Sequence, residues 1–131
     1  MYKNTLKIVC LIFLFSCTHN ANEVFISPSK HFKLQYDVNQ SQTDVTKYKC
    51  IRLKLYNEKE ELLDTLQSDV STYSKWAMAW HPENDTIILN SRDVGIYAYK
   101  IVGAKKLVNI KITPKLNLLA DSIFNKKYSN H

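Results

Sequence analysis

The sequence predicts an α+β fold that is mostly β, with one antiparallel meander sheet and one amphipathic C-terminal helix packed on it. Between residues 32 and 112, apolar and polar residues alternate over several short segments, as they do in half-buried strands. After residue 113 the apolar period changes to that of a helix. These two patterns predict a sheet of about seven strands followed by the helix.

The first strand is expected at residues 32–38, where Phe32, Leu34, Tyr36 and Val38 alternate with polar residues. Further strands are expected at 50–55, 62–66, 76–80, 86–89, 96–102 and 107–112, with turns or loops at 39–46, 57–60, 68–71, 81–85, 91–95 and 103–104. Five aromatic residues in this region fit core packing, and binding of a sugar or a protein partner is the alternative. They are Tyr73, Trp76, Trp80, Tyr97 and Tyr99.

The helix is expected at residues 114–128. Leu116, Leu119, Ala120, Ile123 and Phe124 form one apolar stripe at helical spacing. The residues before this stripe suit a helix start, and two lysines suit the dipole of its last turn. They are Thr113 as N-cap, Pro114 at the first helical position, and Lys126 and Lys127 near the end. We expect the stripe to pack on the sheet, and docking of a partner on an exposed stripe is the alternative.

The N-terminal segment has the three parts of a secretion signal. Lys3 and Lys7 form a basic start, the run 8–15 is apolar, and Ser16 is a small residue before Cys17. A membrane-spanning helix needs about 20 apolar residues, so this run is too short to cross a bilayer. Residues 1–16 are therefore predicted to be a signal peptide.

The stretch Leu14-Phe15-Ser16-Cys17 resembles the lipobox of bacterial lipoproteins. The resemblance implies cleavage before Cys17, a diacylglycerol on its sulfur and a palmitate-type acyl chain on its new amino group. Residues 17–26 are then a lipidated flexible tether, and residues 27–131 a single β-rich globular domain. Because Thr18 follows the cysteine and no acidic run follows it, we expect a lipoprotein of the cell envelope, anchored to a membrane and facing the periplasm.

Charge is distributed unevenly along the chain of 131 residues, whose formal net charge is +6. Residues 17–93 hold nine basic and eleven acidic side chains, whereas residues 94–131 hold seven lysines and the single acid Asp121. Six of these lysines are candidates for a surface that contacts anionic lipid or an acidic protein partner, and a merely solvated face is the alternative. They are Lys105, Lys106, Lys111, Lys115, Lys126 and Lys127. No nucleic-acid recognition motif accompanies them.

Residues with catalytic or metal-binding chemistry do not form a recognisable set. The two glycines are too few for a phosphate loop, and no metalloprotease or dithiol motif occurs. His81 with Glu83 or Asp85 lacks a third donor, so we expect a solvent-exposed turn there. Cys50 is expected to be a small buried hydrophobe rather than a nucleophile. The sequence therefore predicts no enzyme, no metal and no cofactor apart from the lipid on Cys17.

A weak repeat places Pro28 and Pro82, 54 residues apart, in turns that lead into strands. This layout resembles the blades of β-propellers, although fewer than two blades fit in this chain. Ser27-Pro28 followed by Phe32 also resembles the start of small secreted lipoproteins that protect bacteria against toxins. The propeller-like layout implies no activity, whereas the likeness to toxin-protective lipoproteins implies a membrane-anchored, non-enzymatic protein-binding module of the toxin-immunity type. A structural or assembly lipoprotein of the envelope is the alternative.

Overall fold

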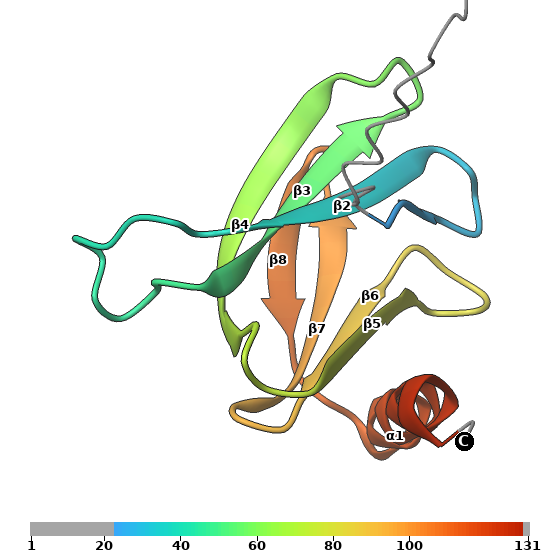
Figure 1. The fold of residues 1–131 in the computed structure, drawn as a ribbon. Helices are drawn as coiled ribbons and strands as arrows, with labels where there is room; N and C mark the ends of the chain where they lie inside the picture. Colours follow the sequence, from blue (N-terminus) through green and yellow to red (C-terminus); the bar gives the residue numbers. More distant parts are fainter. Residues whose placement is uncertain (1–22, 130–131) are drawn as a thin grey trace, which may run out of the picture.

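The computed structural model describes residues 23–129, which form eight strands and one helix (Figure 1). The elements are β1 (Phe25–Ile26), β2 (Phe32–Val38), β3 (Cys50–Asn57), β4 (Leu62–Ser71), β5 (Trp76–Trp80), β6 (Ile87–Ser91), β7 (Gly95–Val102), β8 (Lys106–Ile110) and α1 (Pro114–Tyr128). The predicted fold class, mostly β with one C-terminal helix, is confirmed, and the helix has the predicted bounds. The predicted signal peptide lies outside the described residues.

The strands form two antiparallel sheets of four rather than one meander of about seven. The N-terminal sheet has the order β1-β2-β3-β4, and the C-terminal sheet has the order β5-β6-β7-β8. Each sheet on its own is an antiparallel meander. The chain leaves the first sheet through residues 72–75, where the Thr72 N–H donates to the Lys49 carbonyl at 3.0 Å. Alternation predicts which side chains point inward, but it does not predict where the meander divides.

Two stretches that were predicted to be irregular are strands. Phe25 and Ile26, predicted to lie in the tether, pair with Leu34 and Lys33 of β2. β4 continues to Ser71 through the predicted loop at 68–71. There the Ser68 hydroxyl donates to the Ile51 carbonyl at 2.7 Å, beside a register shift in the pairing of β3 with β4. A side-chain hydrogen bond thus stabilises the irregular end of β4, which the local sequence does not predict to be a strand.

The main core lies between the two sheets. Its largest members are aliphatic or aromatic side chains from alternate strand positions, as the period of two predicts. They are Leu34, Ile51, Leu53, Leu55 and Val70 from the N-terminal sheet, and Trp76, Met78, Ile87, Leu89, Tyr99 and Leu107 from the C-terminal sheet. Of the five aromatic residues considered for binding, Trp76 and Tyr99 are buried here, and Trp80 and Tyr97 pack against this core. Tyr73 is 81% exposed.

A second, smaller core lies between the C-terminal sheet and α1. Ile88 and Ala98 on the sheet meet Leu116 and Ala120 on the helix. The two alanines let the backbones approach, and the Asn90 side chain donates to the Ala120 carbonyl at 3.0 Å. The helix start is as predicted, since Thr113 accepts from the Leu116 N–H at 3.2 Å. The apolar stripe therefore covers the sheet, as expected.

The other face of the N-terminal sheet carries polar and charged side chains. Arg52 binds Asp37 through two hydrogen bonds of 2.8 and 2.7 Å, and Lys54 lies 3.2 Å from the same carboxylate. The bond from Arg52 is the main cause that lowers the pKa of Asp37. A planar guanidinium and a carboxylate in this arrangement make a charge-assisted pair that suits a solvated sheet face. The molecule thus has three layers, with the C-terminal sheet in the middle.

The predicted repeat is present in the backbone. The Ser27 N–H donates to the Phe32 carbonyl at 3.0 Å in the β1–β2 turn, and the His81 N–H donates to the Thr86 carbonyl at 2.7 Å in the β5–β6 turn. Register agrees as well, because Ile26 faces Lys33 and Trp80 faces Ile87 with the same offset of 54 in the sequence. The two sheets therefore begin with equivalent hairpins. The side chain of Asp85 joins the turns by accepting from Ser29 at 2.6 Å.

Candidate functional site

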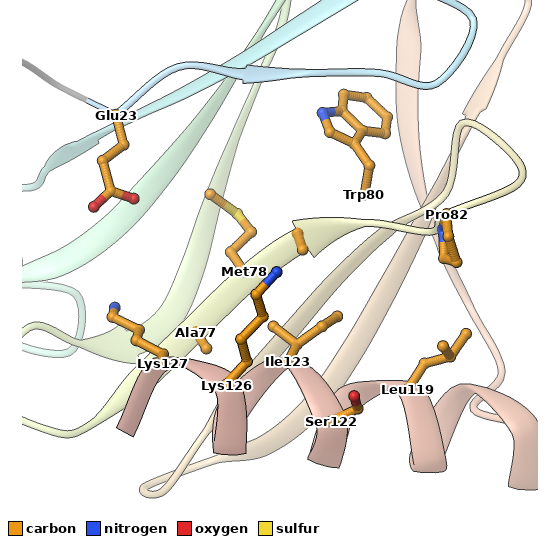
Figure 2. A pocket seen from close by; sticks show the side chains of 11 residues that line it. Glu23, Ala77, Met78, Trp80, Pro82, Leu119, Ser122, Ile123, Lys126 and Lys127 are labelled. Carbon is orange, nitrogen blue, oxygen red and sulfur yellow. The ribbon is translucent and has the colours of Figure 1, made fainter. Parts of the chain in front are cut away.

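A groove runs between the first strand of the C-terminal sheet, β5, and α1 (Figure 2). Its volume is about 580 Å³, which is in the usual range of ligand sites. Most of its lining is apolar and comes from β5 and α1. The lining residues are Ala77, Met78, Ala79, Trp80, Pro82, Leu119 and Ile123, with Glu23, Ser122, Lys126 and Lys127 as polar members.

The sequence Trp76–Trp80 explains why the groove forms here. Trp76 and Met78 are buried between the sheets, so the alternate positions Ala77 and Ala79 face the helix side. Figure 2 shows Leu119 and Ile123 rising from α1 toward β5, and Trp80 pointing away from α1. Because alanine side chains are short, they leave space beside the helix. The groove therefore reaches the backbone of β5.

The edge of β5 is closed at one end by α1. The Trp76 N–H donates to the Tyr128 hydroxyl oxygen at 3.0 Å, and the Trp76 carbonyl accepts from that hydroxyl and from the Lys127 ammonium, each at 2.7 Å. The Lys127 nitrogen also lies 4.3 Å from the centre of the Trp76 ring, in cation–π geometry. Helix side chains thus bind the main-chain groups that a neighbouring strand would bind.

Beyond Trp76 the same edge faces the groove. The pairing of β5 with β6 fixes the alternation. The His81 N–H donates to the carbonyl of Thr86, just before β6, and the Lys75 carbonyl accepts from the N–H of Arg92, just after it. The main-chain groups of the odd-numbered positions 77 and 79 therefore also point to β6. The main-chain groups of Trp76, Met78 and Trp80 therefore point away from β6. In the part of the chain that the structure describes, no strand pairs with β5 on this side. Met78 thus presents one donor and one acceptor toward the groove.

The rim of the groove carries charge of both signs. Lys126 and Lys127 stand on the wall formed by α1, and Glu23 stands on the opposite wall at the start of the described chain (Figure 2). All three residues are exposed. The Trp80 ring N–H donates to the Phe25 carbonyl at 3.0 Å, which ties β5 to β1 beside the wall that carries Glu23. The lysine wall gives the rim an excess of positive charge.

The six candidate lysines do not lie together. Lys126 and Lys127 line the groove, whereas Lys115 is at the other end of α1, about 16 Å along the helix axis. Lys105 and Lys106 lie at the start of β8, and Lys111 follows the end of that strand. Figure 1 shows the start of β8 far from α1. Only the pair at the C-terminal end of the helix belongs to the candidate site.

Two other residues considered from the sequence, Cys50 and His81, are buried in the fold. Cys50 is buried as predicted, and this burial raises the pKa of its thiol. The prediction of a solvent-exposed turn is confirmed for Pro82, Glu83 and Asn84 but is wrong for His81, which is only 7% exposed. Its Nδ1 accepts from the Glu83 N–H at 3.0 Å, which folds the ring over the turn. Cys17 lies outside the described residues.

Sequence reasoning missed three groups of this site: the Met78 main chain, Ser122 and the Tyr128 hydroxyl. The alternation in 76–80 indicates a strand, but an edge strand becomes visible only when the sheet order is known. Within residues 23–129, the histidine, cysteine, aspartate and glutamate side chains form no group of three or more that could hold a metal ion. The helix that these residues form is not long and apolar enough to cross a membrane.

We find no family model that matches this chain, and no match among curated proteins or solved structures.

Replacing Tyr128 with phenylalanine removes the hydroxyl that binds both main-chain groups of Trp76. We expect Tyr128→Phe to lower the free energy of unfolding by about 1 kcal/mol, because the Trp76 N–H loses its partner. A urea titration followed by tryptophan fluorescence measures the change. Tyr97→Phe is the matched control, since the Tyr97 hydroxyl makes no hydrogen bond within residues 23–129. Equal effects of the two substitutions would contradict this assignment.

Proposed function

We propose that this chain is a membrane-anchored lipoprotein of the cell envelope that acts as a non-enzymatic protein-binding module, with the groove between β5 and α1 as its binding site. The observation that carries the proposal is the open edge of β5 at the floor of an apolar groove. The signal-like N-terminal segment and Cys17 support the anchoring.

The groove combines the features of protein-recognition sites. Leu119 and Ile123 supply apolar surface, and Met78 supplies main-chain groups that a bound segment can pair with. Trp80 supplies an aromatic ring of the kind that dominates binding energy in interfaces. The side chains that line the groove are therefore suited to binding a protein segment rather than to cleaving a bond.

The start of the described chain supports a location near the lipid. Glu23 lies on the rim of the groove and follows Cys17 by six residues. A segment of this length spans at most about 20 Å, so an anchor on Cys17 holds the groove close to the membrane. Each buried methylene contributes about 0.8 kcal/mol, and two or three acyl chains on one residue make the anchoring stable.

A toxin-immunity protein is the specific form of this function that we favour. The resemblance of Ser27-Pro28 and Phe32 to the start of toxin-protective lipoproteins supports it. A groove held near the membrane suits interception of a protein that must reach or cross that membrane. The lysines on the rim favour a partner with an acidic surface, because such charges accelerate encounter.

The lipid anchor is tested by palmitate labelling of the protein in growing cells. Cys17→Ala removes the sulfur that carries the diacylglycerol, so we expect the full-length variant to lose its lipid label and to keep its signal segment. The measurement is incorporation of radioactive palmitate, together with the mass of the protein. Cys10→Ala is the control, because Cys10 leaves with the predicted signal peptide. Unchanged palmitate labelling of Cys17→Ala would overturn the anchor.

The binding site is tested by photo-crosslinking in living cells. p-Benzoylphenylalanine in place of Ser122 lies on the groove wall, whereas the same group in place of Asn117 lies on α1 outside the groove lining. We expect an adduct of one defined mass from position 122 and none from position 117. Both side chains are exposed, so the comparison isolates the groove. Equal adducts from both positions, or no adduct from either, would contradict the proposed site.

A further inference from the structure

We propose that the partner binds as an extended acidic segment that adds to the C-terminal sheet as a fifth strand along β5. This inference rests on the proposed function and specifies which kind of segment binds in the groove. Strand addition is a common mode of peptide recognition, in which main-chain bonds provide affinity and alternate side chains provide specificity.

The position of the added strand follows from the contacts at Trp76. Tyr128 and Lys127 already bind the N–H and C=O of Trp76, so the incoming strand starts beyond this residue. The next outward-facing main-chain pair belongs to Met78, about 6.8 Å further along the strand. The incoming segment therefore pairs first with Met78 and extends toward Trp80.

The side chains of the segment alternate between two directions. One set points to α1, where Leu119 and Ile123 form an apolar wall. Since Lys127 contacts Trp76 at the start of β5 and Pro82 after its end lines the groove with Leu119, α1 runs opposite to β5. Along the α1 wall, apolar surface is therefore followed by the lysines.

The charge on this wall selects an acidic segment. Lys126 and Lys127 follow the apolar surface, and among the lining residues within 23–129 Glu23 is the only acid. In the bound segment, side chains two positions apart lie on the same face. If an apolar side chain of the segment contacts Leu119 and Ile123, a carboxylate two positions away reaches Lys126 and Lys127. A basic segment places its ammonium groups against the same lysines, which is unfavourable.

A pair of synthetic peptides tests the charge selection. The probe is a blocked pentapeptide of glutamate, threonine, valine, threonine and glutamate, and its control has lysine in place of glutamate. Fluorescence anisotropy with the full-length chain in detergent micelles measures both dissociation constants. We expect the acidic peptide to bind at least about tenfold more tightly at low salt, with the ratio falling as salt rises. Absence of saturable binding by the acidic peptide, or equal binding of both, overturns the proposal.

Strand addition itself is tested by removing the N–H donors on one edge of the peptide at a time. N-methylation at positions 2 and 4 of the acidic peptide, or at positions 1, 3 and 5, blocks the amides on one edge of the strand at a time. We expect one series to bind at least about fivefold more weakly and the other to bind normally, because only one edge faces β5. Equal effects of the two series overturn strand addition, even where the crosslink from position 122 supports the groove.

A variant of the protein tests the same pairing by removing a main-chain donor of β5 instead of one of the peptide. Met78→Pro deletes the outward N–H, and proline is tolerated on edge strands in this orientation. Met78→Ala is the control, because it removes a similar side-chain volume and keeps the N–H. We expect weaker binding of the acidic peptide by the proline variant than by the alanine variant. Equal binding by two folded variants overturns the pairing with Met78, and the N-methylated peptides decide if the proline variant does not fold.

Discussion

The contact of α1 with Trp76 determines the geometry of the candidate site. Tyr128 and Lys127 occupy both main-chain groups of this residue at the start of β5, so the end of the helix is fixed against the edge of the sheet. Further along β5, the short side chains of Ala77 and Ala79 leave space between the strand and the helix. The edge is therefore covered at one end and becomes the floor of a groove at the other. Edge strands that stay open in this way tend to accept another strand.

The three-layer arrangement places the groove on the helix side of the C-terminal sheet. Leu34 and Ile88 occupy equivalent positions in the two hairpins, but Leu34 faces the C-terminal sheet and Ile88 faces α1. The equivalent face of each sheet is thus covered: that of the N-terminal sheet by the C-terminal sheet, and that of the C-terminal sheet by α1. The remaining face of the N-terminal sheet carries the Asp37–Arg52 pair and is polar. Beside α1, apolar surface and an open strand edge therefore lie together.

Local patterns predicted the elements, and long-range pairing decided the rest. The helix was predictable because Thr113, Pro114 and the apolar stripe are signals within one segment of the chain. Most strands were predictable from alternation, but the last part of β4 was not, because it depends on a bond from Ser68 to the distant Ile51. The division into two sheets depends on which strands pair, and alternation carries no information about pairing.

The groove could not be predicted for the same reason. The alternation at Trp76, Met78 and Trp80 looks like that of any half-buried strand, and only the sheet order makes β5 an edge. The lysines were visible in the sequence, but their distribution was not. Lys126 and Lys127 reach the groove because α1 is long enough to bring its last turn to Trp76. The chemistry of the site thus arises from residues that are ordinary in their own segments.

Hydrogen exchange of single amides in β5 tests the open edge most directly. The Ala77 N–H points to β6, and the Met78 N–H points to the groove. In the full-length protein without a partner, the account predicts that the Met78 amide exchanges at least about tenfold faster than the Ala77 amide. Equal and strong protection of both amides would mean that the edge is already closed, and it would contradict the account.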